Sequence, residues 1–204
     1  MVRRTIALSV LVEVPRIKGS RFVARLAPVS DVAAARAFVA DVHERFPDAT
    51  HHAAAWRFGP DERHADDDGE VGGTAGPPLL ARLDGQSLEG VVMVVSRWYG
   101  GTKLGKGGLV RAYGGAASAA VAEATIVEER VRTRVSVRCA HALVGPLEGV
   151  AGRFEGETVV DWQPPPTMHV DVPVEHAAAL LDALRERAAG RVEVVQAPQG
   201  YNNA

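Results

Sequence analysis

Hydrophobic and polar positions alternate along two stretches near the start of the chain, residues 6–14 and 22–26. This alternation is typical of half-buried strands, and the glycine-containing turn at residues 16–20 predicts that the two strands form a hairpin. Apolar residues then recur every three or four positions through residues 32–46, which predicts a helix. Ser30 is suited to cap the start of this helix, and Pro47 prevents its continuation.

The middle of the chain carries one strong strand signal. Residues 91–95 are apolar without interruption, as expected for a strand that is buried on both faces. The other elements predicted here are a strand at 50–58, a surface loop at 59–73, a short helix capped by Thr74 that reaches about Leu83, and a helix from about Lys106 or Gly107 to the region of Glu128.

The last third of the chain contains two consecutive strand-helix-strand patterns. The predicted order is a strand at 134–140, a helix at 145–154, strands at 158–163 and 168–172, a helix at 175–189 and a strand at 192–196. This βαββαβ order is that of ferredoxin-like domains. Because charged residues 128–132 mark a boundary, we predict an α+β protein with two domains, residues 1–130 and 131–204.

Composition places the chain among ordinary globular proteins. Its 204 residues, 47% of them hydrophobic, can bury one or two cores. The single Cys139 excludes an internal disulfide, and its position in an alternating strand predicts a buried, unreactive thiol. The first apolar run meets Glu13 and Pro15 and has no small-residue cleavage site, so we interpret it as a strand and not as a signal peptide. No run reaches the ~18 apolar residues of a membrane span, and we therefore expect a cytoplasmic protein without a membrane partner.

A net charge of −2 conceals two segments of opposite charge. Residues 61–70 contain six acids and one Arg, whereas residues 97–111 contain four basic residues and no acid. The basic segment has the composition of an anion cradle, because glycine-rich backbone can direct its N–H groups at a ligand and a following helix adds its positive end. Its candidate anion-binding or RNA-binding residues are Arg97, Gly100, Gly101, Lys103, Lys106, Gly107, Gly108 and Arg111.

Phosphate is the expected ligand of this segment, although its spacing matches neither the P-loop nor the dinucleotide-binding pattern. A tight glycine-rich turn with solvated lysines accounts for the same residues without any ligand. Trp98, Tyr99 and Tyr113 are of the type that stacks on single-stranded RNA bases, and packing within the loop is the alternative.

The acidic segment offers the oxygen ligands that hard divalent cations prefer, in Asp66, Asp67, Asp68 and Glu70, but it lacks the spacing of an EF-hand. Ion pairs with Arg97 or Lys103 and acid–base chemistry are the alternatives. One histidine of the pair His51 and His52 is placed to reach this cluster. We therefore regard Asp67, Asp68, Glu70 and His51 as candidate supporting or metal-binding residues, and assign no catalytic residue, no metal and no cofactor.

Four segments resemble the signature of the YigZ/IMPACT family. They are residues 67–70 (Asp-Asp-Gly-Glu), 73–76 (Gly-Thr-Ala-Gly), 97–105 (Arg-Trp-Tyr-Gly-Gly-Thr-Lys-Leu-Gly) and 107–113 (Gly-Gly-Leu-Val-Arg-Ala-Tyr). Lys18, Ser20 and Phe22 resemble the opening pattern of the family, and residues 49–52 resemble its Ala-Thr-His segment. The chain departs from the family pattern at Val71 (usually Pro), Gly72 (usually Ser) and residues 98–99 (usually Tyr-Phe), and none of these changes removes a charged group.

The resemblance covers about residues 15–120 and implies an N-terminal domain with the left-handed βαβ fold of a ribosomal protein domain, followed by a ferredoxin-like domain. In eukaryotic relatives the signature domain belongs to a regulator of translation initiation. Some members have carried a proline-peptidase label, but this sequence shows neither a nucleophile triad nor a convincing metal set.

These observations favour a non-catalytic, translation-associated binding protein. We expect it to contact RNA phosphate or a ribosome-linked protein through Arg97, Lys103, Lys106 and Arg111. The alternative is a hydrolase for a phosphorylated or peptide substrate that uses the Asp/Glu cluster and the anion-binding loop. The sequence leaves the oligomeric state open.

Overall fold

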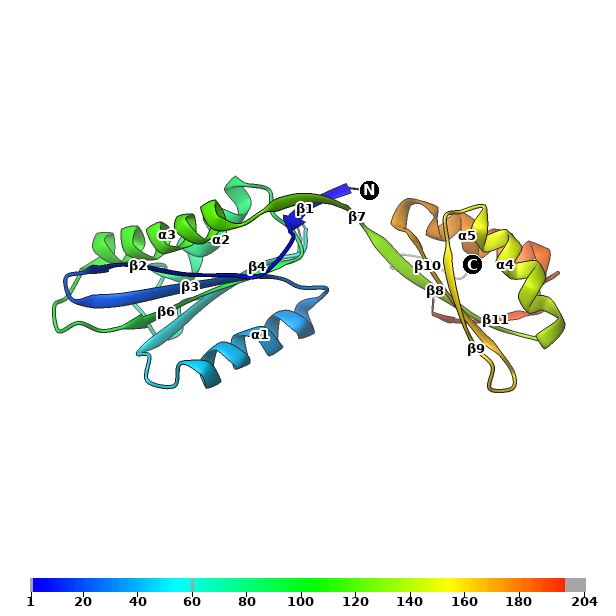
Figure 1. Ribbon diagram of the computed structural model, residues 1–204, viewed down its shortest axis with the longest axis horizontal. Helices are drawn as coiled ribbons and strands as arrows, with labels where there is room; N and C mark the ends of the chain where they lie inside the picture. The colour runs from blue at the N-terminus through cyan, green and yellow to red at the C-terminus, as the bar shows by residue number, and fades with distance from the viewer. Residues whose placement is uncertain (1, 60, 197–204) are drawn as a thin grey trace. The chain divides into compact units, whose positions relative to one another are not determined.

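The computed structural model describes residues 2–59 and 61–196 (Figure 1). Contacts between residues divide this chain into two compact units. One unit is Arg3–Glu129, and the other runs from Arg130 onward and includes Val2. Each unit has its own buried apolar core, and the two are described separately below.

The first unit contains a five-stranded antiparallel sheet in the order β2-β3-β6-β4-β5. Its strands are β2 (Val10–Ile17), β3 (Ser20–Pro28), β6 (Val91–Trp98), β4 (His51–Arg57) and β5 (Arg63–Asp66). Strand β6 is central and is buried from Val91 to Arg97, as its uninterrupted apolar sequence predicts. Arg97 is therefore a charged residue at the end of a core strand.

Helices cover both faces of this sheet, which explains why β6 has no solvated side. Helix α1 (Val32–Arg45) lies on one face, and helices α2 (Gly76–Gly85) and α3 (Lys106–Glu123) lie on the other (Figure 1). Because side chains alternate along a strand, Val92 and Val94 pack in the α1 layer while Met93 and Val95 pack beneath α2 and α3. The candidate site lies on the α2 and α3 side.

Several local predictions for this unit are wrong, among them the helix expected to reach the region of Glu128, because α3 ends at Glu123 and a strand follows it. The stretch predicted as one strand at 6–14 is interrupted at residues 7–9, and β1 (Val2–Ile6) pairs with β7 (Ile126–Arg130) while only β2 joins the large sheet. Asp31, not Ser30, caps α1, since its carboxylate accepts from the N–H of Ala34 at 2.8 Å. The predicted loop at 59–73 contains β5, an edge strand too polar to carry a hydrophobic signal.

The second unit has the predicted βαββαβ order. Its elements are β8 (Arg132–Cys139), η1 (His141–Leu143), α4 (Val144–Gly152), β9 (Glu157–Asp161), β10 (Thr167–Pro173), α5 (Val174–Arg187) and β11 (Val192–Gln196). The four strands form an antiparallel sheet in the order β11-β8-β10-β9, the ferredoxin-like arrangement. Cys139 lies in its core, where burial raises the pKa of the thiol. The α+β class predicted from the sequence is confirmed.

None of the helices in the described residues has both the length and the apolar character that crossing a membrane would require.

Candidate functional site

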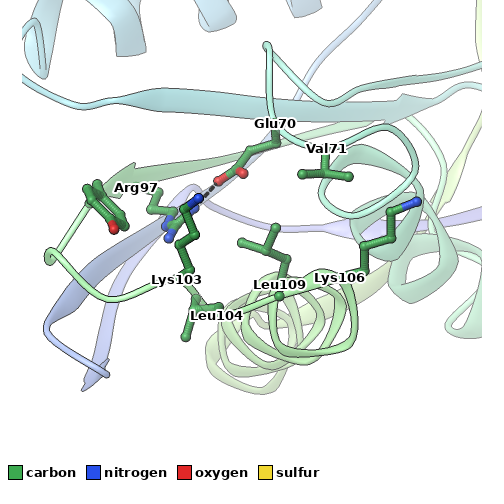
Figure 2. A pocket seen from close by; sticks show the side chains of 9 residues that line it. Glu70, Val71, Arg97, Lys103, Leu104, Lys106 and Leu109 are labelled. Atoms are coloured by element: carbon green, nitrogen blue, oxygen red, sulfur yellow. Dashed lines mark hydrogen bonds and ion pairs between the residues drawn. The ribbon is translucent and has the colours of Figure 1, made fainter.

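The acidic and the basic segments line one pocket. The pocket has a volume of about 290 Å³ and opens beside the N-terminal end of α3 (Figure 2). Its nine lining residues are Glu70, Val71, Arg97, Tyr99, Lys103, Leu104, Gly105, Lys106 and Leu109. Glu70 and Val71 come from the loop between β5 and α2, and the others come from the end of β6, the glycine-rich loop and the start of α3.

A buried ion pair occupies one wall of this pocket. The Nη1 atom of Arg97 donates to Oε1 of Glu70 at 2.5 Å, and the Nη2 atom donates to the hydroxyl of Ser20 at 3.3 Å. The side chains of Arg97 and Glu70 expose only 6% and 5% of their surface. The prediction that Arg97 is an available anion ligand is therefore wrong for this structure, because Glu70 neutralises its guanidinium. The predicted pairing of the acidic segment with Arg97 is what the structure shows.

Tyr113 belongs to the same buried network. Its hydroxyl donates to Oε1 of Glu70 at 2.9 Å, and its ring meets that of Phe22 edge to face with centroids 5.3 Å apart. Burial raises the pKa of Tyr113 far above its usual range, and the nearby Glu70 carboxylate raises it further. Because the ring is fully buried, the prediction that Tyr113 stacks on a base is wrong for this structure.

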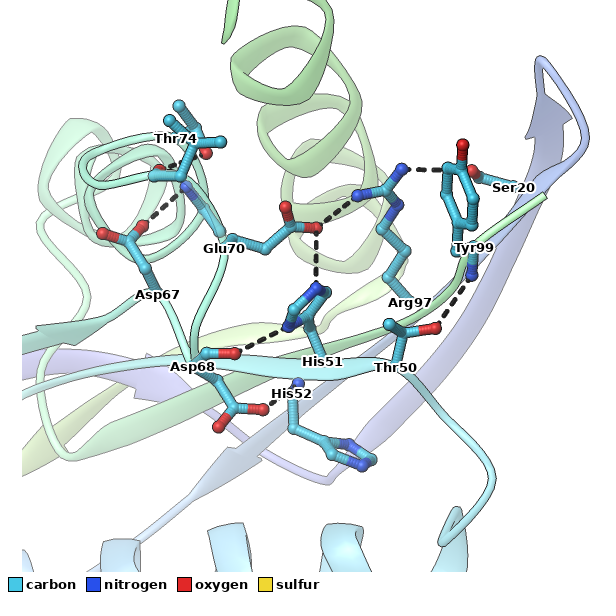
Figure 3. A network of polar contacts seen from close by, with 12 residues as sticks. Ser20, Thr50, His51, His52, Asp67, Asp68, Glu70, Thr74, Arg97 and Tyr99 are labelled. Carbon is cyan, nitrogen blue, oxygen red and sulfur yellow. Dashed lines mark hydrogen bonds and ion pairs between the residues drawn. The ribbon is translucent and has the colours of Figure 1, made fainter. Parts of the chain in front are cut away.

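Asp67 holds the acidic loop in shape. Its carboxylate accepts hydrogen bonds from the N–H groups of Gly73, Ala75 and Gly76 at 2.7, 2.8 and 2.9 Å. Figure 3 shows Asp67 beside Thr74 in this loop. Burial raises the pKa of Asp67, but these backbone donors outweigh it and lower the pKa overall. Asp67 thus performs the capping of α2 that was predicted for Thr74, whose hydroxyl instead donates to the carbonyl of Val71 at 2.6 Å.

Asp68 ties the same loop to β4. Its Oδ2 atom accepts from the backbone N–H of His52 at 2.6 Å, and its carbonyl lies 2.7 Å from Nδ1 of His51. A carbonyl only accepts, so Nδ1 of His51 carries the proton and Nε2 faces Oε1 of Glu70 at 3.9 Å. Within residues 2–59 and 61–196, no three histidine, cysteine, aspartate or glutamate side chains converge as a metal site requires. The acids order the backbone.

Gly100 was predicted from the sequence to bind an anion, but in the structure it permits close packing of two loops. A Cβ atom at this position would lie 1.9 Å from the carbonyl carbon of Gly19, in the turn between β2 and β3. The N–H of Gly100 donates to the hydroxyl of Ser20 at 3.2 Å and is not free for a ligand. Gly101 is exposed and has a φ of +84°, a conformation that glycine adopts without strain.

The positive end of α3 and two lysines form the accessible cationic part of the site. Gly105 is the N-cap of α3 and provides no side-chain cap, and the first turn contains no acid. The N–H groups of Lys106, Gly107 and Gly108 begin the helix and have no intrahelical acceptor. Lys103 and Lys106 are exposed, and among the described residues neither has a carboxylate within ion-pair distance.

Three further candidates differ in position. Arg111 is exposed on α3 but does not line the pocket. Trp98 is half-buried, with its ring 5.5 Å from that of Phe46 and the Arg21 guanidinium 4.3 Å from its ring centre, so its stacking face is taken. Tyr99 lines the pocket with the Arg97 guanidinium 5.6 Å from its ring centre, and as it is 47% exposed, the uncovered part of its ring is an accessible aromatic surface of the site.

Sequence reasoning did not select Val71, Leu104 and Leu109 as lining residues. The two leucines occupy the positions before the N-cap and four residues into α3, a spacing known as the hydrophobic staple. This pattern was visible in the sequence, and it places both side chains at the N-terminal end of α3. Val71 carried no comparable signal.

The fold and site together define a two-domain α+β protein with a small pocket bordered by cations on its first unit. Residues 18–121 match the family model of the Impact N-terminal domain. The chain is 36% identical over 187 residues to IMPACT family member YigZ of Escherichia coli (strain K12), covering 89% of this chain and 92% of that protein. This chain belongs to the IMPACT family.

Two other relatives extend the comparison. A protein of known crystal structure, described as hypothetical, is 33% identical with a TM-score of 0.73 and is matched over 97% of this chain and 98% of its own. Protein IMPACT of Rattus norvegicus is 36% identical over 93 residues, which are 42% of this chain and 29% of that protein. The first match spans both units, and the second is confined to a smaller part of the chain.

Proposed function

We propose that this chain is a translation-associated binding protein that contacts RNA phosphate through Lys103, Lys106 and the N-terminal end of α3. One observation carries the proposal: two exposed lysines without carboxylate partners in the described chain flank a pocket at an uncapped helix N-terminus. The association with translation rests on the family. The signature of this chain resembles that of eukaryotic members, in which it belongs to a regulator of translation initiation. A cytoplasmic location is part of the same proposal.

The charges of the pocket support an anionic ligand. Three cations, Arg97, Lys103 and Lys106, line it together with one carboxylate, Glu70. The buried ion pair cancels the charges of Arg97 and Glu70, so the two lysines remain to attract phosphate. Arg97 acts as a positioning residue in this proposal, because it holds the acidic loop against β6 and thereby keeps the wall of the pocket in place.

Two carboxylates on which the hydrolase alternative depends, those of Asp67 and Asp68, are engaged with the backbone. Asp67 accepts three N–H groups, and Asp68 accepts the N–H of His52. Through these hydrogen bonds Asp67 and Asp68 stabilise the loop. No further contact of the described residues favours catalysis over binding. Turnover by the purified protein of phosphorylated or peptide substrates, lost in Asp68→Asn, would revive the hydrolase hypothesis.

Binding to RNA across a salt series tests the proposal. A fluorescent single-stranded RNA should bind the full chain with an affinity that falls steeply as salt rises. The double variant Lys103→Gln with Lys106→Gln should weaken binding and reduce the slope of log K against log salt by about 2. The matched control removes two exposed charges from α1 on the opposite face of the sheet, in Arg36→Gln with Arg45→Gln, and should retain the slope.

The outcomes separate RNA from a protein partner. An unchanged affinity in the lysine double variant, or no binding at low salt, would overturn RNA contact at this site. Capture of a ribosome-linked protein by the unaltered chain but not by the lysine double variant, together with absence of RNA binding, would instead assign the same surface to a protein partner.

A further inference from the structure

The residues that line the pocket are of two chemical kinds. Val71, Leu104 and Leu109 supply apolar side chains, whereas the ammonium groups belong to Lys103 and Lys106 (Figure 2). An apolar wall does not compensate a phosphate for lost hydration, but it suits the face of a flat ring. The pocket is therefore suited to a ligand with an apolar ring at one end and an anion at the other.

Glu70 adds a requirement for a hydrogen-bond donor on the ligand that enters the pocket. Every contact of its carboxylate within the described chain goes to Oε1, from Arg97, Tyr113 and His51. The Oε2 atom accepts no hydrogen bond from the described residues, although the side chain is 5% exposed and lines the pocket. A carboxylate oxygen in this position has no proton to donate to a phosphate and accepts a hydrogen bond from an N–H donor. The ligand group that enters should thus be uncharged, flat and able to donate.

The size of the pocket limits how much of a polymer can enter. Its volume of about 290 Å³ lies just below the roughly 300–1,000 Å³ of ordinary small-molecule sites. One unstacked base with part of its sugar is of this scale, while a duplex or a run of stacked bases is not. The exposed ring of Tyr99 offers a stacking surface at the same opening.

We propose that the pocket binds one unstacked nucleotide of a single-stranded RNA, with an amino-bearing base inside and its phosphate at the rim. The base lies against Leu104 and Leu109 and donates from its exocyclic amine to Oε2 of Glu70. The phosphate lies at Lys103 and Lys106. This inference rests on the proposed RNA contact and adds a base preference that contact with phosphate alone does not produce.

Cytosine and uracil provide the sharpest comparison, because position 4 of the ring carries an amine donor in cytosine and a carbonyl acceptor in uracil. Fluorescence anisotropy with oligocytidylate and oligouridylate of equal length should show at least about fivefold tighter binding of the cytidine oligomer. The salt slopes of the two oligomers should agree, because their phosphates are the same. Methyl NMR signals of Val71, Leu104 and Leu109 should shift when CMP is added.

Two variants test separately the residues that bind the phosphate and the residue that binds the base. Lys103→Gln with Lys106→Gln should weaken both oligomers by the same factor and preserve their ratio. Glu70→Gln should reduce the ratio toward one. Since Glu70 also partners buried Arg97, that variant is judged only if its circular dichroism matches that of the parent, and the comparison on the unaltered protein decides the matter by itself.

The results distinguish the two proposals. Equal affinity for both oligomers, with unshifted methyl signals of Leu104 and Leu109, would overturn the nucleotide pocket and leave the phosphate contact standing. Absence of binding to either oligomer at low salt would overturn both, and so would exclusive binding of an acidic peptide. A cytidine preference that persists in a well-folded Glu70→Gln variant would also overturn the assignment of the amine to Glu70.

Discussion

Glu70 and Arg97 form an ion pair in which Oε1 and Nη1 lie 2.5 Å apart and neither side chain exposes more than 6% of its surface. The pair joins the loop after β5 to the end of the central strand β6. Because the charges compensate each other, a cation at the end of a core strand is tolerated, and the adjacent pocket keeps its shape.

Loss of Arg97 should therefore be far more damaging than loss of a surface cation. Arg97→Leu leaves the Glu70 carboxylate buried without a counter-charge, and we expect the free energy of unfolding in urea to fall by about 3–5 kcal/mol. The control Arg111→Gln removes an exposed charge from α3 and should change it by no more than about 0.5 kcal/mol. A loss in Arg97→Leu no larger than that of the control would show that the pair contributes nothing.

Asp67 should be required for the acidic loop and should make stability sensitive to acid. Asp67→Ala strips an acceptor from three N–H groups, and we expect a loss of about 1–3 kcal/mol in urea unfolding at pH 7. The control Asp61→Ala alters an exposed acid and should be nearly neutral.

The acid dependence follows from the lowered pKa of Asp67. The folded pKa lies below the unfolded value of about 3.9, so this carboxylate stabilises the fold fully above that pH and loses its contribution as pH falls through the folded pKa. Between pH 6 and pH 3 the parent should lose more stability than Asp67→Ala. Parallel acid curves for the two proteins would contradict this reading.

His52 should destabilise the fold as pH falls through mild acid. Burial lowers its pKa, and the neighbouring His43, whose ring centre is 4.1 Å away, lowers it further. The unfolded chain then binds the proton more tightly, so stability is full above about pH 6.5 and decreases as pH falls below that value toward the folded pKa. An NMR titration should place the His52 midpoint below about 6.5.

The variant His43→Gln tests the cause. Removal of the neighbouring ring charge should raise the His52 midpoint, while His141→Gln, a substitution in the second unit, should leave it unchanged. A His52 midpoint at or above the ordinary histidine value would contradict the role assigned to burial.

Two glycines of one region should respond in opposite ways to a methyl group. Gly100→Ala places Cβ against the backbone of Gly19, and we expect it to destabilise the protein by about 1–3 kcal/mol. Gly115→Ala adds a methyl group on α3 where no atom outside the local helix backbone lies within 4 Å, and should stabilise by about 0.5–1 kcal/mol. Thermal unfolding of both variants measures this contrast, and equal shifts in Tm would refute it.

Local patterning predicted most of the elements. The uninterrupted apolar run of β6, the helical spacing in α1 and the strand-helix order from β8 to β11 each report burial of a segment by itself, and all of these elements were placed correctly within a few residues. The short polar strand β5 carries no such signal, because a strand at a sheet edge is held mainly by its backbone pairing.

For the site, the sequence by itself determined which side chains are available: a run of acids, a run of cations and the glycines that permit close turns. Only the tertiary structure decided how they are used. Arg97 donates hydrogen bonds to Glu70, 27 residues away in the sequence, and to Ser20, 77 residues away. Because of these partners, a residue predicted to bind an anion is instead a buried structural residue. Such pairing depends on which loops the sheet brings together, a long-range property that no local spacing encodes, whereas Lys103 and Lys106 remain exposed because no described carboxylate reaches them.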